Sequence, residues 1–540
     1  MVLGGGIAGI ASAVFLLEQG YPVTLVEARR FLGGRVFSFT DEETGVPVDN
    51  GQHVIVGCCS YFIGFLKRLG VSDQWYLQPR LRLRVLDRQG KEGLLAASRL
   101  PAPFHLLPAL LAYPHLETGD KIRAIAALAR AKFTNRHQPY LEEMTFYQWL
   151  KQQGQSERAI QNLWNLLVMP TLNDDVREVS AAMGLMIVQE GMLEGYHNAD
   201  VGYAADGLLA AIGEPAKKYL LDKGARLLLG SSVRRVCLGS NRVKGIELAS
   251  GDVVTGEVYV SALPFSVLLG VLPGDIIEQP FLQRLSSLET SPIVNIHLWY
   301  DRPVMDGDFC ALIDSPLQWV FNKSAILGGE HKDSPALSSE IKIPPAPLYQ
   351  RGAGPHHPPL SQRERGDDPL SDSPPSQGGE SQSLPPWEGG RLGWGLNGIG
   401  KSPFRKGGFR GISAHADQSP SREEETDQGQ YICISVSAAW EYIDKAREEL
   451  AQQFIDEMAE VFPRAREAKV KRSIVVKQRH ATFRCLPGAN ELRPGSQTPI
   501  ANLFLAGEWT DTGWPSTMES AVRSGYNAAQ AIISSPQGGG

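Results

Sequence analysis

The first 27 residues contain the pattern that most restricts how this chain can fold. Three glycines form a GxGxxG turn between a short apolar strand and a helix: Gly4, Gly6 and Gly9. The helix is expected over residues 10–19, and a second apolar strand over residues 22–27 ends at Glu27. Such a strand–turn–helix–strand unit is typical of a Rossmann-like parallel sheet that binds a dinucleotide. A glycine turn with a purely structural role is the alternative, and the complete unit disfavours it.

The spacing within this unit has a stereochemical reason. Gly4 permits the tight turn, Gly6 lets a diphosphate approach the backbone, and Gly9 lets the helix pack closely on the strand. The diphosphate is expected at the positive N-terminus of the helix. Glu27 can accept both hydroxyls of an adenosine ribose, and its charge disfavours a 2′-phosphate. The residues expected around this part of the dinucleotide are Gly4, Gly6, Ile7, Ala8, Gly9, Glu27, Ala28 and Arg29.

A second glycine motif, Gly33-Gly34-Arg35, follows shortly after Glu27. With it the sequence resembles the flavoprotein superfamily of amine oxidases and phytoene desaturases. In that superfamily a GxGxxG, an acidic residue and a Gly-Gly-Arg form one fingerprint for FAD, with the arginine near the diphosphate. The resemblance implies FAD as the cofactor, because NAD dehydrogenases lack the second motif. The first strand is shorter than is usual there, which leaves open whether the coding sequence begins upstream of Met1.

The C-terminal end carries a further part of the same fingerprint. A strand is expected over residues 503–506 and a helix over residues 516–533. By the resemblance, Glu508 binds the ribitol of FAD, and the N-terminus of the helix points at the flavin pyrimidine, where its partial positive charge stabilises reduced flavin. The residues placed there are Gly507, Glu508, Ser516, Thr517 and Met518.

Two of the implied contacts keep a structural alternative. The C-terminal helix could be an ordinary capped surface helix. Val233 falls where the backbone of the family contacts adenine, and an ordinary core valine is the alternative.

A more specific resemblance begins at Asp49-Asn50-Gly51-Gln52-His53. This motif looks like the bacterial hydroxysqualene dehydroxylases, also called squalene-associated FAD-dependent desaturases, and it lies where the family's chain passes the flavin ring. Gly51 and Gln52 are therefore expected beside FAD. His53 is a candidate general acid or flavin-edge contact, and a structural histidine is an equal alternative. Other stretches agree with the resemblance: Thr171-Leu172-Asn173, Val179-Ser180-Ala181, Ala481-Thr482-Phe483, Leu492-Arg493-Pro494-Gly495, residues 507–513, Glu519 and residues 521–525. Glu508 stands where this subfamily often has Asp.

The resemblance implies reductive removal of the allylic hydroxyl of hydroxysqualene, which gives squalene in bacterial squalene and hopanoid biosynthesis. A proton donor would let water leave, and reduced FAD would supply hydride. The source of electrons for FAD is open between NAD(P)H and a reductase, because no second nucleotide-binding fingerprint is visible. The alternatives are a carotenoid desaturase or amine oxidase on the same fold, and a lipid or prenyl escort protein without flavin chemistry.

A long-chain isoprenoid substrate requires an apolar tunnel. Residues 101–116 are apolar and rich in proline, and they are the candidate entrance at a membrane face, with buried core as the alternative. Arg479, His480 and Arg484 form a basic cluster that is either a solvated face or a diphosphate contact. We expect a cytoplasmic protein, with peripheral contact to the inner face of the membrane.

The chain is predicted to be an α/β protein with a Rossmann-like FAD-binding domain and an interleaved α+β substrate-binding domain. Residues 333–428 are rich in Pro-Pro and Gly-Gly pairs and predict a disordered insertion between two strands. The FAD-binding domain is assigned residues 1–51, 201–270 and 471–534. The substrate domain is assigned residues 52–200, largely helical, 271–332 and 429–470, and residues 535–540 form a flexible tail.

Composition excludes several other classes. The 540 residues carry a formal net charge of −6, which disfavours a nucleic-acid binder. Hydrophobic residues make up 42% and charged residues 21%, as in ordinary globular proteins. The six cysteines contain no CxxC pair, so we expect neither a metal site nor a disulfide scaffold. No apolar run of the length of a spanning helix is present, and the first residues do not resemble a signal peptide.

Overall fold

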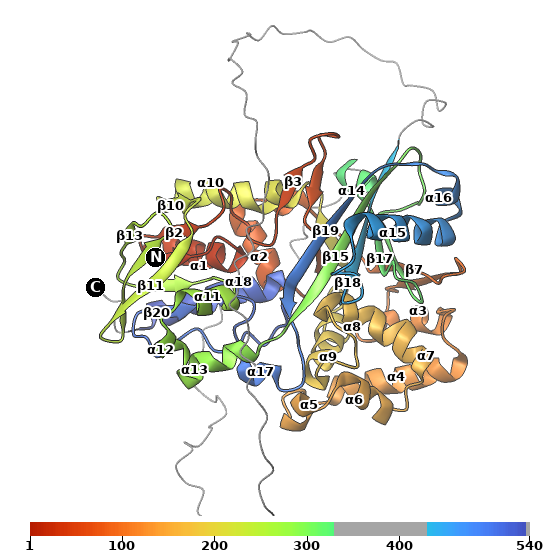
Figure 1. The fold of residues 1–540 in the computed structure, drawn as a ribbon. Helices are drawn as coiled ribbons and strands as arrows, with labels where there is room; N and C mark the ends of the chain where they lie inside the picture. Colours follow the sequence, from red (N-terminus) through yellow and green to blue (C-terminus); the bar gives the residue numbers. More distant parts are fainter. Residues whose placement is uncertain (329–428, 536–540) are drawn as a thin grey trace, which may run out of the picture. The chain divides into compact units, whose positions relative to one another are not determined.

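The computed structural model describes residues 1–328 and 429–535. Its first sheet has five strands, all parallel, in the order β10-β2-β1-β14-β20. The strands are β10 (Arg226–Leu229), β2 (Thr24–Glu27), β1 (Val2–Leu3), β14 (Tyr259–Ser261) and β20 (Leu503–Leu505). Figure 1 shows that red, yellow-green and blue segments, far apart in sequence, lie together here. The predicted α/β class with a Rossmann-like parallel sheet is confirmed.

Two helices from opposite ends of the chain pack against each other on this sheet, α1 (Ile7–Glu18) and α18 (Met518–Ile533). The contact is close because of Gly525, where a Cβ would lie 2.5 Å from the carbonyl oxygen of Ala8. Both helices contribute to one apolar core with the parallel sheet. The N-terminal and C-terminal parts of the predicted FAD fingerprint therefore belong to one packed unit.

The second sheet has seven strands in the order β19-β15-β18-β17-β16-β7-β8. They are β19 (Val470–Phe483), β15 (Thr290–Tyr300), β18 (Gln430–Ser437), β17 (Trp319–Asn322), β16 (Phe309–Leu312), β7 (Arg82–Leu86) and β8 (Glu92–Ala96). Ile296 and Leu298 of β15 pack in one core with Phe454 of α15 (Arg447–Val461). Because side chains alternate along a strand, His297 and its neighbours two residues away lie on the opposite face.

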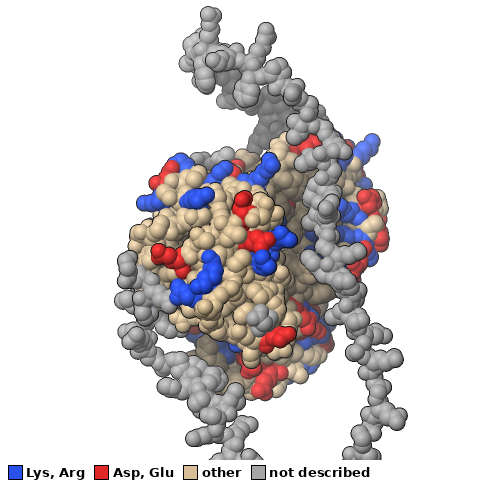
Figure 2. Space-filling model, turned by 60° about the vertical axis from the view of Figure 1, so that its left-hand side comes forward, with Lys and Arg blue, Asp and Glu red and all other residues tan. Residues whose placement is uncertain are grey.

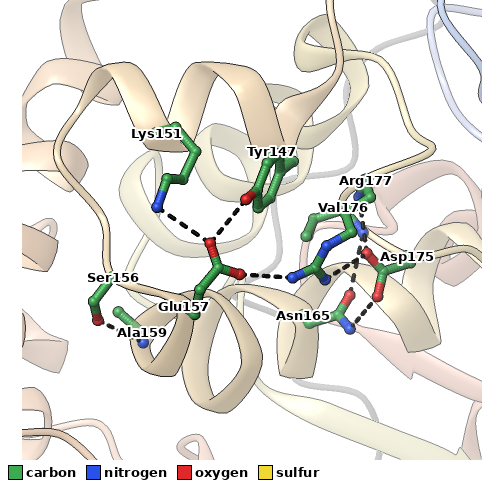
Figure 3. A network of polar contacts seen from close by, with 9 residues as sticks. All are labelled: Tyr147, Lys151, Ser156, Glu157, Ala159, Asn165, Asp175, Val176 and Arg177. Atoms are coloured by element: carbon green, nitrogen blue, oxygen red, sulfur yellow. Dashed lines mark hydrogen bonds and ion pairs between the residues drawn. The ribbon is translucent and has the colours of Figure 1, made fainter.

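A helical region follows the β7–β8 hairpin. Its helices are α3 (Leu107–Ala112), α4 (Thr118–Phe133), α5 (Pro139–Glu143), α6 (Phe146–Gln152), α7 (Glu157–Ala159), α8 (Asn165–Leu172) and α9 (Ala181–Val188). Glu157 links them through one carboxylate, which accepts from Tyr147 at 2.8 Å, from Lys151 at 3.1 Å and from Arg177 at 2.7 Å (Figure 3). This network fixes the segment after α8, which carries part of the hydroxysqualene dehydroxylase resemblance.

Smaller elements connect these layers. The helices are α2 (Ser60–Leu69), α10 (Glu214–Asp222), α11 (Phe265–Val271), α12 (Gly274–Ile277), α13 (Pro280–Gln283), α14 (Lys323–Gly328), α16 (Pro463–Glu467) and α17 (Ala489–Leu492). The strands are β3 (Ser38–Thr40), β4 (Pro47–Asp49), β5 (Val54–Val56), β6 (Trp75–Leu77), β9 (Val201–Ala204), β11 (Val233–Gly239), β12 (Arg242–Leu248) and β13 (Val253–Val254).

Several predicted elements need correction. Residues 52–200 contain four short strands, β5 to β8, besides their helices, and α2 lies between β5 and β6. Strand β16 is an element that the sequence analysis missed. The apolar residues of 253–261 predict one strand, but the structure has two short strands there, β13 and β14. The apolar residues of 442–460 recur at a helical spacing and predict one amphipathic helix, but α15 begins only at Arg447. Lys477 of β19 donates to the carbonyls of Ile443 and Lys445 and holds them in a turn.

The surface is mixed in charge. On the face drawn in Figure 2, Lys and Arg side chains are interspersed with Asp and Glu, and neither sign forms a continuous stripe. Among the residues that the structure describes, no helix is both long and apolar enough to cross a membrane. The predicted insertion at 333–428 and residues 536–540 of the predicted tail lie outside the described residues. The predicted domain limits stay a prediction.

Candidate flavin site

The glycine turn lies where the carboxyl ends of β1 and β2 meet. The N–H of Gly4 donates to the carbonyl of Val26 at 2.8 Å, with Gly4 in a left-handed conformation at φ 101°. A Cβ at Gly9 would lie 1.9 Å from the carbonyl oxygen of Gly4, so only glycine fits there. At Gly6 a Cβ would meet only the Cα of Gly34, at 3.8 Å, so this glycine leaves open room for a close approach.

The N-terminus of α1 is free to bind an anion. Its first helical hydrogen bond runs from the N–H of Ile10 to the carbonyl of Gly6 at 2.9 Å, so the preceding N–H groups of Ile7, Ala8 and Gly9 have no helical acceptor. Within the described residues, no side chain caps this end and no acidic residue occupies the first turn. An uncapped helix N-terminus beside an open glycine fits a diphosphate.

Glu27 lies buried at the end of β2, directly beside the glycine turn. Its carboxylate accepts from the backbone N–H of Gly5 at 2.6 Å and from that of Arg29 at 2.8 Å. Each oxygen retains a further lone pair, which can accept a ribose hydroxyl. The backbone N–H of Ser231 donates to the carbonyl of Glu27 at 2.9 Å, and this places the start of β11, at Val233, near the predicted adenosine position. The side chain of Ala28 is exposed.

The two glycine motifs touch each other. The N–H of Gly33 donates to the carbonyl of Gly5 at 2.8 Å, and a Cβ at Gly34 would lie 2.8 Å from the Cα of Gly6. Arg29 donates from Nη1 to the carbonyl of Gly34 at 2.8 Å. Gly33 and Gly34 have φ values of 118° and 60°, so side chains are disfavoured at both. The motifs therefore form one continuous glycine surface.

Arg35 connects this surface to the C-terminal part of the fingerprint. Its guanidinium forms an ion pair with Glu508 and donates to the carbonyl of Ala481 at 2.7 Å. The side-chain amide of Asn50 donates to the carbonyl of Arg35 at 2.6 Å. The predicted motifs at 33–35, 49–53 and 507–508 are thus brought together by direct contacts.

The loop after β20 approaches the N-terminus of α18. Gly507 donates from its N–H to Ser524 Oγ at 2.8 Å, which fixes the end of the strand against the helix. The helix begins at Met518 and not at residue 516, because the Thr517 hydroxyl caps it by accepting from the N–H of Ser520 at 3.2 Å. Ser516, Thr517 and Met518 therefore lie at the helix N-terminus as predicted.

The loop of residues 49–53 is fastened to the seven-stranded sheet. Lys323 donates from Nζ to Asp49 Oδ2 at 2.9 Å and to Gln52 Oε1 at 3.0 Å. Asn295 donates to the carbonyl of Asn50 at 3.3 Å. A Cβ at Gly51 would lie 2.7 Å from the side-chain nitrogen of Asn295, so glycine is required where the loop crosses β15.

His53 ends this loop and is only partly exposed. Its Nδ1 lies 2.9 Å from the carbonyl oxygen of Gly51. Because a carbonyl only accepts, Nδ1 carries the hydrogen, and Nε2 is the atom that can gain or lose a proton. Burial lowers the pKa of His53 below its ordinary value, so the neutral form predominates near pH 7.

The comparisons with known proteins agree with this geometry. The profile of the flavin containing amine oxidoreductase family matches residues 7–332 and 409–533. The chain belongs to the flavin-containing amine oxidoreductases. This confirms FAD as the cofactor that the sequence predicts. The glycine surface, the uncapped N-terminus of α1 and Glu27 all fit this cofactor.

Curated relatives match this amine oxidoreductase along nearly all of its length. The 15-cis-phytoene desaturase of Synechococcus elongatus is 23% identical over 98% of this chain and 95% of the relative. The zeta-carotene desaturase of Synechocystis sp. is 24% identical over 98% of this chain and 96% of the relative. Among solved structures, an oxidoreductase from Methanosarcina mazei has a TM-score of 0.62 at 13% identity, covering 99% of both chains. A cyclohexylamine oxidase from Brevibacterium oxydans has a TM-score of 0.59 at 16% identity, covering 98% of this chain and 97% of that one.

Sequence reasoning missed two cationic residues of this amine oxidoreductase. Arg493 is buried, donates to the carbonyls of Thr510 at 2.5 Å and Trp514 at 2.8 Å, and so shapes the loop that leads to α18. Its stretch was part of the resemblance, but nothing in the sequence assigned it a role. Nothing in the sequence indicated that Lys323 belongs to the site, since a single lysine after an apolar strand is common.

A buried histidine on β15 was also missed. His297 lies 2.8 Å from the Tyr431 hydroxyl through Nδ1, and Tyr431 stacks on Trp299 at 4.3 Å between ring centroids. Its Nε2 has no hydrogen-bond partner within the described part of the chain. Burial lowers the pKa of His297 to about 4, so the ring is neutral at physiological pH.

The basic cluster near the end of β19 binds carboxylates of the protein itself. Arg484 pairs with Asp174 at 2.6 Å and with Glu289 at 2.9 Å. Arg479 pairs with Asp444 at 2.5 Å, and His480 contacts the Thr290 hydroxyl. Arg479 and Asp444 are exposed, as on a solvated face, whereas Arg484 is largely buried among carboxylates. A diphosphate contact of the cluster stays a prediction.

The apolar segment at 101–116 is divided between core and surface. Tyr113 and His105 are buried. Phe104 and Leu111 are exposed at 57% and 52%. The segment is thus part core and part surface, and its role as an entrance at a membrane face stays a prediction.

Proposed function

We propose that this flavoprotein removes the hydroxyl of hydroxysqualene reductively and releases squalene. The observation that carries the proposal is the convergence of the stretches that resemble hydroxysqualene dehydroxylases. Asn173 donates from Nδ2 to Thr482 Oγ1 at 2.8 Å, and its Oδ1 accepts from the N–H of Ala438 at 2.7 Å. Ser291, near the start of β15, donates to the carbonyl of Asn173 at 2.7 Å. Two of these stretches therefore touch, and Arg35 of the flavin site donates to the carbonyl of Ala481, the residue before Thr482.

The face of the seven-stranded sheet next to residues 49–53 supports an apolar, unsaturated substrate. Its strands present aromatic rings, with Trp319 stacked on Phe321 at 6.0 Å and Phe309 tilted against Phe321 at 5.9 Å between centroids. These residues belong to the same apolar cluster as the helical region. The same face carries the polar side chains of Asn295 and His297, and aromatic walls with a few placed polar groups are typical of sites for lipophilic ligands.

The chemistry requires one hydride and one proton for each hydroxyl removed. The C–O bond of the allylic alcohol breaks, the hydroxyl leaves as water with the added proton, and a C–H bond forms at the same carbon. FAD, when bound and reduced, supplies the hydride. The chain orients the isoprenoid and excludes water, and His53 would carry the proton at Nε2, because its Nδ1 is committed to Gly51.

A second candidate is desaturation of a carotenoid precursor. It is favoured by the curated phytoene and zeta-carotene desaturases, which match over at least 98% of this chain. In that reaction the substrate loses a hydride and a proton, and an external oxidant reoxidises the flavin. Neutral His53, with a lone pair at Nε2, would then serve as the proton acceptor.

An anaerobic single turnover separates the two reactions. The purified holoenzyme is reduced with dithionite and mixed with hydroxysqualene, and the flavin spectrum and the extracted lipids are followed together. Reoxidation of flavin in step with formation of squalene is the expected result. If reduced flavin persists, while oxidised enzyme is bleached by phytoene, the desaturase is the correct function and the dehydroxylase is not.

A further inference from the structure

Lys323 is an unusual residue for the interior of a protein. It is the first residue of α14, directly after β17, and its side chain is 1% exposed. Burial of an ammonium group is costly unless the charge is paired and hydrogen-bonded. Lys323 meets both conditions, with Asp49 at 2.9 Å and Gln52 at 3.0 Å. Both partners belong to the loop that the sequence analysis places beside the flavin.

Asp49 is held from a second direction. Its Oδ1 accepts from the backbone N–H of Leu208 at 3.0 Å, while Oδ2 accepts from Lys323. The side chain of Asp49 is 3% exposed, so neither charge of the pair is screened by solvent. The loop is therefore anchored at its first residue to two separate parts of the chain.

The remaining contacts place the same loop between the glycine surface and the sheet. Asn50 donates to the carbonyl of Arg35, and Asn295 of β15 donates to the carbonyl of Asn50. Lys323 follows strand β17 of the sheet and reaches two side chains of residues 49–53. Among the described residues, its contact is the only one between the sheet side and this loop that carries full charge. Loss of Lys323 would remove this charged link, while Asn295 would still hold the carbonyl of Asn50.

We propose that Lys323 is a positioning residue for the flavin site, whose buried ammonium fixes residues 49–53 between the seven-stranded sheet and the flavin. The ion pair sets the conformation of Gln52 and His53 relative to the Gly33-Gly34-Arg35 motif. A side chain that positions others within a water-excluded site acts through geometry, without touching the reacting atoms itself. The proposal holds for either candidate substrate, since it concerns the cofactor side of the site.

The test compares Lys323→Met with the double variant Asp49→Asn/Lys323→Met in the full-length chain. Apoprotein is titrated with FAD, and the absorption spectrum and reduction potential of the bound flavin are measured beside the thermal unfolding temperature. Lys323→Met is expected to weaken FAD binding at least tenfold and to shift the flavin bands. The double variant, which leaves no unpaired charge, is expected to regain thermal stability but not the wild-type affinity or spectrum.

Arg136→Met provides the matched control. Arg136 is half-buried and holds Gln189 and Glu190 in the helical region, away from residues 49–53. The Arg136→Met variant should have a lower unfolding temperature, while its FAD affinity and flavin spectrum stay as in the wild type. Wild-type flavin affinity and spectrum in either Lys323 variant would overturn the proposal, and the double variant provides this result even if Lys323→Met alone does not fold. Because no isoprenoid is used, this outcome is independent of the proposed dehydroxylation.

Discussion

Arg35 and Glu508 form an ion pair although almost the whole chain separates them in sequence. Arg35 follows the second glycine motif, and Glu508 follows the strand β20 at the C-terminal end of the parallel sheet. The guanidinium also holds the carbonyl of Ala481, so three segments meet at one side chain. The pair therefore joins the two halves of the FAD fingerprint at the position where the resemblance places the diphosphate and the ribitol.

Replacement of Arg35 should weaken cofactor binding more than it weakens the fold. The Arg35 side chain is 40% exposed, so its ion pair contributes little to stability. Arg35→Met is expected to lower FAD affinity about tenfold, which corresponds to about 1.4 kcal/mol. Titration of apoprotein with FAD measures this change. Arg84→Met is the control, because Arg84 pairs with Glu92 in the β7–β8 hairpin with similar exposure; equal effects of the two changes on FAD affinity would contradict the assignment of Arg35.

Two glycines of the first turn should respond differently to alanine. A Cβ at Gly9 meets a backbone carbonyl at 1.9 Å, whereas a Cβ at Gly6 meets only the Cα of Gly34 at 3.8 Å. Gly9→Ala is therefore expected to destabilise the apoprotein by several kcal/mol, on the order of other overpacked core sites. Gly6→Ala is expected to leave the unfolding temperature of the apoprotein nearly unchanged and to reduce FAD affinity by more than tenfold. Calorimetry and FAD titration distinguish the two, and full FAD affinity in Gly6→Ala would show that the diphosphate lies elsewhere.

The parts of this site that were predictable are those encoded locally. Gly4, Gly9 and Glu27 lie within one strand–turn–helix–strand unit, and their spacing alone constrains the backbone. By contrast, Lys323 reaches Asp49 across 274 residues, and His297 reaches Tyr431 across 134. No periodicity or motif indicates such pairs, because they arise only when segments far apart in the sequence come together in the folded chain.

The errors in the predicted helices and strands also arise from contacts between distant parts of the chain. Strands β5 and β6 are only three residues long and both pair with the distant β9, so their sequence alone does not separate them from helix. The late start of α15 depends on Lys477 of β19. Its ammonium group donates to the carbonyls of Ile443 and Lys445, which therefore do not join the helix. Local propensity is overridden where a distant side chain satisfies the backbone.

His297 should make the folded protein sensitive to acid. Its pKa is about 4 in the folded chain because burial disfavours the charged ring, against about 6.5 when unfolded. Between these values the unfolded chain binds one more proton, so stability is fully present above about pH 6.5 and falls as the pH is lowered. The loss contributed by this ring is roughly 2 kcal/mol between pH 6.5 and 5.

Urea unfolding of the wild type and of His297→Asn at pH 7.5 and pH 5 measures this contribution. The variant is expected to be less stable at pH 7.5, because Tyr431 loses its partner, but to lose less stability on acidification. The other histidines titrate in both proteins, so their contribution to the loss of stability cancels when the two proteins are compared. Parallel losses in the wild type and the variant would show that His297 is solvated in the folded state.

His53 should give the turnover a pH dependence whose sign identifies its role. Its pKa lies below the ordinary value, and Nε2 is the atom that exchanges the proton. As a proton donor for dehydroxylation, His53 must be protonated, so the rate should rise about tenfold for each pH unit lowered, until the pH reaches this pKa. As an acceptor in desaturation, the neutral ring is active, and the rate should instead fall as the pH drops below the pKa. Anaerobic single-turnover rates between pH 5 and 8 measure the sign, and His53→Gln should abolish the dependence in either case. A wild-type profile that the substitution leaves unchanged would remove His53 from the reaction and leave it as a structural residue of the loop.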